Sequence, residues 1–211
     1  MERNLTLINY LRKLSPLLEK IIDKALRENI RILETQELFQ LTSRHFSLPK
    51  WDKATILGAG HFPQIGLPRI IIVSLSEIKK IAKVALGIVE IGFAHEIAHN
   101  LTWENRPDCA VYKDSSFLIP VFTPCSYFEP LAYYLALQII DELKRGLPDF
   151  KPPLFYGKRM TYLEILHHYR IPHCYFERSK KCDGIKSHQL KQCPKEKEIK
   201  KLARAIDKYK N

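Results

Sequence analysis

The sequence predicts an α+β fold in which a small mixed or antiparallel sheet packs on a helix that carries the segment His95-Glu96-Ile97-Ala98-His99. Three observations support this fold class. Apolar residues recur at helical spacing in several long segments, two short segments have the composition of buried strands, and the segment before His95 is apolar and free of proline. With 45% hydrophobic residues over 211 positions, the chain can form a substantial core.

Two helices and two strands are expected before the His-Glu segment. Apolar spacing predicts one amphipathic helix first and a shorter one after it. Glycines in the first strand suit a place where another backbone approaches closely, and three isoleucines in the second favour a buried pleated surface. Ser74 or Ser76 caps the next helix. The predicted ranges are 5–29 and 34–44 for the helices, and 51–60 and 68–75 for the strands.

After these strands the sequence is predicted to be mainly helical. The helix that carries His95 runs from about residue 82 or 86 to 101, and residues 127–143 form the next strong helix. Glycine and prolines between 146 and 153 then mark a break. We therefore predict a first domain over residues 1–147 and a basic, mostly helical appendage over 148–211, with helices at 161–169 and 196–209.

The spacing of His95 and His99 predicts a metal site. Residues four apart stand on one face of a helix, so two imidazoles can bind one zinc ion, and Glu96 can act as the general base on a zinc-activated water. The flanking run 84–94 is mostly apolar, and Gly92, Ala94 and Ala98 permit close packing. The alternative is a core helix with two buried histidines, although burial of an unpartnered glutamate there would be costly.

The order of elements from 50 to 145 resembles the catalytic core of zincin metallopeptidases. A catalytic zinc takes three protein ligands and a water. Glu129-Pro-Leu-Ala132-Tyr-Tyr-Leu135-Ala136 looks like the Glu-x-x-Ala-x-x-Phe/Leu-Ala of compact gluzincin-like proteins, which include ImmA-like repressor proteases and archaeal mini-gluzincins. The resemblance implies that zinc is bound by His95, His99 and Glu129.

Other third ligands fit the sequence less well than Glu129. Thr102 and Asn105 stand where metzincins have glycine and their last ligand, which rejects that class. SprT-like proteases use a third histidine, and none occurs between His99 and His167. Asp108 and Asp114 remain alternatives. Glu129 itself has a second interpretation, because Ser126-x-x-Glu129 is also a capping box and Pro130 restricts the backbone of Glu129.

The resemblance also implies a mechanism, the hydrolysis of peptide bonds. Zinc lowers the pKa of its water and polarises the scissile carbonyl, while Glu96 moves the water proton to the leaving amine. Tyr112, Tyr133 and His168 are undistinguished candidates for holding the oxyanion. Substrate would lie along the edge segment 54–61, near His61, although an exposed loop histidine is the simpler interpretation. Cys125 is either a ligand in a latent form or an inert buried thiol.

The C-terminal part has its own signals. Residues 151–211 hold 16 Lys and Arg against 6 Asp and Glu, a share of +10 in a total of +11. Such a segment can bind nucleic acid, form a solvated basic surface, or fold over the cleft. Four side chains there have the composition of a second, structural zinc site, with unligated cysteines as the alternative: Cys174, Cys182, His188 and Cys193.

Composition also predicts the cellular setting. Five cysteines without even spacing argue against a secreted disulfide framework. No run reaches the roughly 18–20 apolar residues of a membrane span, and no signal peptide is visible. The leading prediction is a cytoplasmic zinc endopeptidase with a protein or peptide substrate and no membrane partner. The alternative is a nucleic-acid-binding protein on a zincin-like scaffold, or a protease recruited to nucleoprotein by its basic region.

Overall fold

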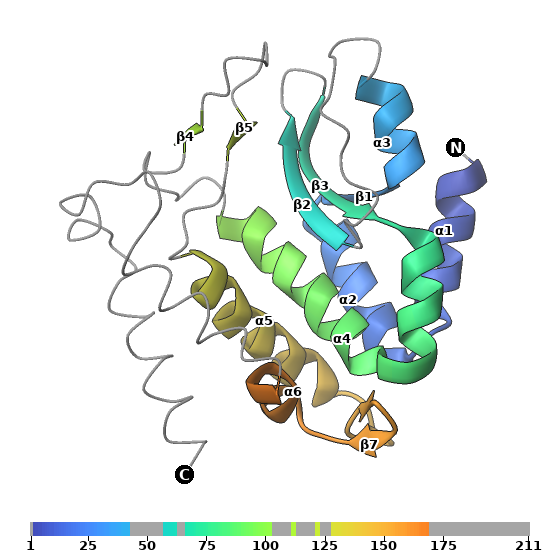
Figure 1. Ribbon diagram of the computed structural model, residues 1–211, viewed down its shortest axis with the longest axis vertical. Helices are drawn as coiled ribbons and strands as arrows, with labels where there is room; N and C mark the ends of the chain where they lie inside the picture. Colours follow the sequence, from blue (N-terminus) through green and yellow to red (C-terminus); the bar gives the residue numbers. More distant parts are fainter. Residues whose placement is uncertain are drawn as a thin grey trace, which may run out of the picture.

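A computed structural model describes residues 2–42, 57–62, 66–102, 111–112, 121–122 and 128–168 of the chain. Over these ranges the protein is mixed α+β, with six helices and three small sheets (Figure 1). The predicted α+β class is confirmed at this level. Within the same ranges, no helix combines the length and the apolar character needed to cross a membrane.

The main sheet has three strands in the order β1-β3-β2. The central strand β3 (Leu67–Val73) pairs in parallel with β1 (Arg31–Glu34) and antiparallel with β2 (Leu57–Phe62), so the sheet is mixed. The sequence predicted β2 and β3 but not β1. Four residues between two helices are too few to show an alternating pattern, and β1 becomes a strand only because β3 lies beside it.

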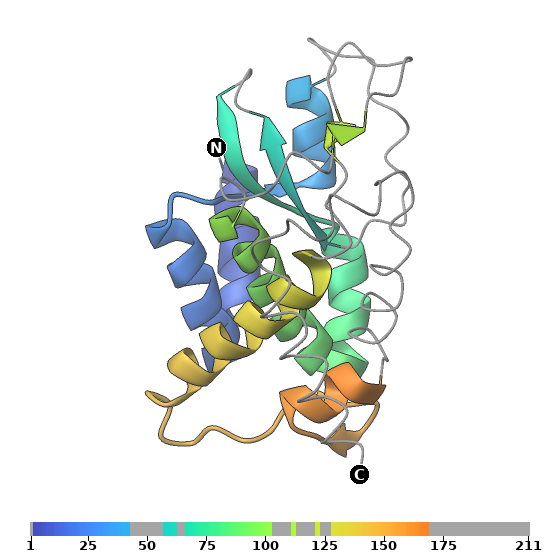
Figure 2. The same cartoon turned by 90° about the vertical axis from the view of Figure 1, so that its left-hand side faces the viewer.

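Side chains on both faces of this sheet are buried. Successive side chains of a strand point to opposite faces, so neighbouring residues of β3 enter different hydrophobic clusters. Ile71 and Val73 belong to the large core that the sheet shares with most of the helices. Ile70 and Ile72 face the other way, into a smaller cluster with Leu38 of helix α3 (Thr35–Thr42). The isoleucine run that predicted a strand therefore contributes side chains to two cores. Figures 1 and 2 show the backbone of the sheet with helices α3 and α4 (Leu75–Thr102) near it.

The predicted single helix over 5–29 is wrong. The chain instead forms α1 (Glu2–Arg12) and α2 (Pro16–Arg27), which pack on each other. The break lies at Ser15, whose Oγ accepts a hydrogen bond of 3.0 Å from the backbone N–H of Leu18. Pro16 follows at the first helical position, where its missing N–H costs nothing. The sequence did not predict this helix start because apolar residues continue at helical spacing on both sides of Ser15.

Helix α4 (Leu75–Thr102) carries the His-Glu segment and has a break of its own. Ala85 leaves the helical conformation, at φ −150° and ψ 60°, so α4 consists of two helical halves. The backbone N–H of Tyr156 donates a 3.0 Å hydrogen bond to the carbonyl of Val84 at this break. The predicted start of the second half, near residue 82 or 86, agrees with the position of the kink.

The remaining elements follow α4. Helix α5 (Phe128–Lys144) confirms the helix predicted over 127–143, and α6 (Tyr162–His168) confirms the one over 161–169. A capping box starts α6, since the Thr161 Oγ1 accepts from the Glu164 backbone and the Glu164 carboxylate accepts from the Thr161 backbone. The predicted helix over 196–209 lies outside the described residues.

Four short strands complete the described fold. β4 (Val111–Tyr112) pairs with β5 (Val121–Phe122), and β6 (Leu154–Phe155) pairs with β7 (Lys158–Arg159), both antiparallel. The β6–β7 turn has positive φ at both central residues, as tight hairpins require. Buried side chains of β6 and α6 join the large core around the first part of α4.

Candidate metal centre

His95 and His99 lie one turn apart on the second half of α4, and both are buried, at 5% and 4% exposure. Their Nε2 atoms are 2.9 Å apart, with the ring centroids at 4.4 Å and the ring planes at 87°. The spacing in the sequence predicted that both side chains share one face of a helix. The structure brings them together, with one nitrogen of each ring aimed at the same small region.

The distance between the two nitrogens fits a shared zinc ion to within a small adjustment. Two zinc–nitrogen bonds of about 2.0–2.1 Å at a tetrahedral angle would place the nitrogens about 3.3 Å apart. The observed 2.9 Å requires the two rings to separate by only a few tenths of an ångström. The same distance also suits a direct hydrogen bond between two imidazoles, so a measurement of bound metal decides between the two arrangements.

The other faces of this half-helix fix it in the protein. Phe93, Ala94, Ile97 and Ala98 are all fully buried, which anchors the helix in the core. A Cβ added at Gly92 would lie 2.9 Å from Cδ2 of Leu57, so β2 and α4 approach closely there. Gly92, Ala94 and Ala98, which the sequence predicted to permit close packing, therefore lie where α4 packs closely against its neighbours.

Asn100 ties the end of the motif to the central strand. Its Nδ2 donates to the backbone carbonyl of Ile70 in β3 at 3.0 Å and to that of Glu96 at 2.9 Å, and the side chain is 2% exposed. A buried amide that links a helix to a neighbouring strand sets both the distance and the rotation of the helix. Asn100 therefore positions His95 and His99 relative to the sheet, a role that the sequence did not reveal.

Tyr133 of α5 packs directly on His95, with ring centroids 3.9 Å apart and planes tilted by 31°. This contact fixes the plane of the imidazole. Ala132 and Ala136 are buried beside it, which lets α5 approach α4 closely. Tyr133 was one of three undistinguished candidates for holding the oxyanion, and the structure places its ring against His95. His168, a second candidate, packs instead on Phe155 at 5.2 Å.

The predicted third ligand, Glu129, lies in the first turn of α5. It precedes Tyr133 by four residues, so its backbone is one helical turn from the residue that contacts His95, on the same side of α5. The side chain of Glu129 is outside the described part. Among the described residues no three His, Cys, Asp or Glu side chains gather as a metal site.

Several other predicted residues lie outside the described ranges. These include the alternative ligands Asp108 and Asp114, and Cys125. The side chains of Tyr112 and His61 are also not described, although their backbones lie in β4 and β2. The whole predicted second zinc site, formed by Cys174, Cys182, His188 and Cys193, also lies outside the described ranges. Glu96 is described and half-buried, directly after His95 on α4.

Sequence reasoning missed a buried, hydrogen-bonded carboxyl group on the same helix. Glu90 is 3% exposed, and its Oε1 accepts a 2.6 Å hydrogen bond from the Ser15 hydroxyl while its Oε2 accepts from the Tyr162 hydroxyl. Burial raises the pKa of Glu90 above its usual value, and these two hydrogen bonds oppose the rise. Burial and the neighbouring Glu90 also raise the pKa of Tyr162. The signal in the sequence was a single acid in the apolar run 84–94.

Comparison with protein-family models, with curated proteins and with solved structures finds no match to this chain. The interpretation of the site therefore depends on its own residues and geometry.

Proposed function

We propose that the protein is a zinc-dependent endopeptidase with a zincin-like core of the gluzincin type. The observation that carries this proposal is the pair of buried histidines on α4, whose Nε2 atoms approach to 2.9 Å beside Glu96. His95, His99 and Glu129 would hold the zinc ion. Bound zinc would supply Lewis acidity, which lowers the pKa of a bound water and polarises a carbonyl.

In this proposal the protein's own residues divide the remaining work. The Glu96 carboxylate takes the proton of the attacking water and passes it to the nitrogen of the leaving amine. Tyr133 helps to hold His95 through ring contact, and Asn100 helps to hold this part of α4 through hydrogen bonds to backbone carbonyls. Two nitrogens and one carboxylate oxygen form a donor set that zinc accepts in catalytic sites.

The sheet supports a peptide as substrate. β2 is an edge strand of the three-stranded sheet, with β3 as its strand partner in the described part of the chain. β2 also lies against the second half of α4, where Leu57 approaches Gly92. An extended peptide can add to such an edge through main-chain hydrogen bonds. We therefore propose that substrate pairs with β2 and passes over the second half of α4.

The test is Glu96→Gln, which keeps the size of the side chain and removes its basicity. The proposal expects peptide hydrolysis to fall by about a hundredfold or more, while zinc content stays that of the wild type. Glu142→Gln, an exposed position on α5, is the matched control and should retain full activity. Wild-type rates in Glu96→Gln would rule out the proposed mechanism.

The +10 charge of residues 151–211 favours a second function, nucleic-acid binding. Most of this segment lies outside the described residues, so the proposal rests on charge alone. Binding of DNA or RNA should be strong at low salt and fall steeply as salt rises, because Lys and Arg release counterions from the phosphates. A fluorescence titration without binding at low salt would remove this function and leave the peptidase proposal untouched.

A further inference from the structure

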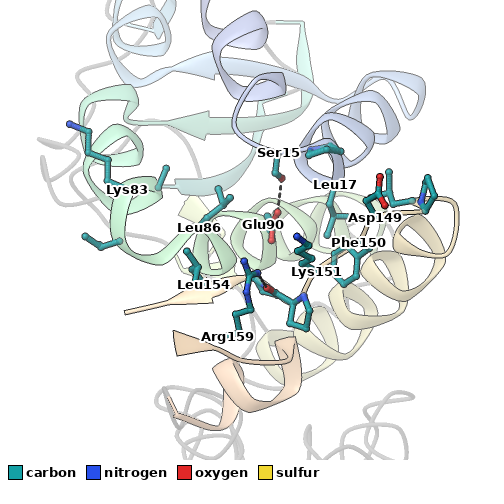
Figure 3. A pocket seen from close by; sticks show the side chains of 17 residues that line it. Ser15, Leu17, Lys83, Leu86, Glu90, Asp149, Phe150, Lys151, Leu154 and Arg159 are labelled. Carbon is teal, nitrogen blue, oxygen red and sulfur yellow. Dashed lines mark hydrogen bonds between the residues drawn. The ribbon is translucent and has the colours of Figure 1, made fainter. Parts of the chain in front are cut away.

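A cavity of about 520 Å³ lies beside the kink of α4, apart from the histidine pair. Its walls come from the start of α2, from α4 around the kink, and from the segment that leads from α5 through β7 (Figure 3). Glu90, which reaches its wall, precedes His95 by five residues, or about 7.5 Å along the helix axis. Most of the wall is apolar, with contributions from Pro16, Leu17, Val84, Leu86, Phe150 and Leu154.

Glu90 connects three elements at the wall of this cavity through hydrogen bonds. Its carboxylate accepts hydrogen bonds from Ser15, just before α2, and from Tyr162, at the start of α6. Both oxygens are therefore engaged by elements of the protein. Burial raises the pKa of Glu90, and these two hydrogen bonds oppose the rise. Glu90 therefore links the start of α2, helix α4 and the start of α6 at the wall of the cavity.

Three cationic side chains line the same cavity, Lys83, Lys151 and Arg159. The Arg159 Nη1 donates a 2.9 Å hydrogen bond to the carbonyl of Pro152, which holds the guanidinium at the wall. Figure 3 shows Arg159 and Lys151 projecting over the stretch of α4 that carries Glu90, whereas the amine of Lys83 points away. Within the described ranges neither Lys151 nor Arg159 forms a salt bridge with a carboxylate. The lining also holds two acids, Asp149 and the hydrogen-bonded Glu90.

We propose that this cavity binds a small amphiphilic carboxylate, with an unbranched alkyl chain of medium length against the apolar wall and its carboxylate between Lys151 and Arg159. The volume is in the range of sites that enclose most of a small ligand. An apolar body and one charged end match the two kinds of surface that the cavity offers. The proposal does not depend on the metal site or on peptidase activity.

Calorimetric titration of the full chain with hexanoate, heptanoate and octanoate tests the alkyl part. The dissociation constant should fall by about fourfold for each added methylene, because each is transferred from water to the apolar wall. Octylamine and octanol serve as matched probes of charge. Octanoate should bind more tightly than both of them.

Variants test the charged end. The double variant Lys151→Ala/Arg159→Ala should weaken octanoate by at least about tenfold and leave octanol unchanged. Lys158→Ala is the matched control, since Lys158 is an exposed neighbour of Arg159 outside the lining, and it should bind octanoate like the wild type. The proposal is overturned if octanoate does not bind at millimolar concentration, if octylamine binds more tightly, or if the double variant binds octanoate unchanged.

Discussion

Replacement of Glu90 by glutamine should make the protein more stable at neutral and alkaline pH. The ordinary pKa of this carboxyl is 4.5, and burial at 3% exposure raises it in the folded protein. The folded state therefore keeps its proton to a higher pH than the unfolded state does. Consequently, the contribution of Glu90 to the free energy of unfolding falls as pH rises from about 4.5 through the raised pKa, and stays lowered above it.

The glutamine of the Glu90→Gln protein does not titrate, so this variant should lack the fall. Below pH 4.5 the two proteins should have similar stability, because a protonated glutamate and a glutamine have similar size and hydrogen-bonding capacity. Above the raised pKa the variant should be more stable by about 1.4 kcal/mol for each unit by which the pKa is raised. For a chain of this size, 1 kcal/mol corresponds to about 2–4 °C in Tm.

Urea denaturation of both proteins across the pH range measures the effect, with Glu142→Gln as the exposed control. The stability difference between variant and wild type should grow with pH for Glu90→Gln, and by more than for Glu142→Gln. A difference that is independent of pH, or one that favours the wild type more as pH rises, would refute the explanation of this carboxyl group.

Two further predictions test how tightly α4 is held. Tyr133→Ala should weaken zinc binding by about tenfold because His95 loses the ring that fixes its plane. Tyr133→Phe keeps a ring and should bind zinc like the wild type in a competition titration with a chelator. Equal zinc affinities of the two variants would contradict this role of Tyr133. Gly87→Ala should lower the free energy of unfolding by about 1–2 kcal/mol, because the new Cβ would lie 2.9 Å from Cβ of the rigid Pro153 ring. Gly92→Ala should be close to neutral, since its contact is the end of a flexible leucine side chain and alanine favours a helix; a larger loss there than at Gly87 would refute the comparison.

The sequence alone predicted the parts of the fold that depend on local patterns. The helices over 127–143 and 161–169 and the strand at 68–75 have clear periodicity or composition, and the structure has them within a few residues. The division between α1 and α2 was missed because the apolar positions continue in phase across Ser15. Strand β1 was missed because its four residues are held by pairing with β3, a contact between distant parts of the chain.

In the candidate site, too, the features set by local spacing were predicted and the features set by contacts between distant residues were not. The spacing of His95 and His99 predicted their shared face, because it follows from the geometry of one helix. The contacts of Tyr133 and Asn100 depend on how α5 and β3 pack against that helix, and no local pattern encodes them. Glu90 shows a further limit, since its partners Ser15 and Tyr162 are more than 70 residues away in the sequence. Long-range polar contacts become visible only in three dimensions.

The most direct test of the central claim is zinc-edge X-ray absorption on the purified wild type and on His99→Ala, with metal content measured in parallel. The account predicts a wild-type zinc with nitrogen and oxygen neighbours at about 2.0–2.2 Å, and loss of that zinc in His99→Ala. Cys182→Ser, in the proposed second site, is the control and should leave this signal intact. Equal zinc content in wild type and His99→Ala, or only sulfur neighbours at about 2.3 Å, would contradict the claim.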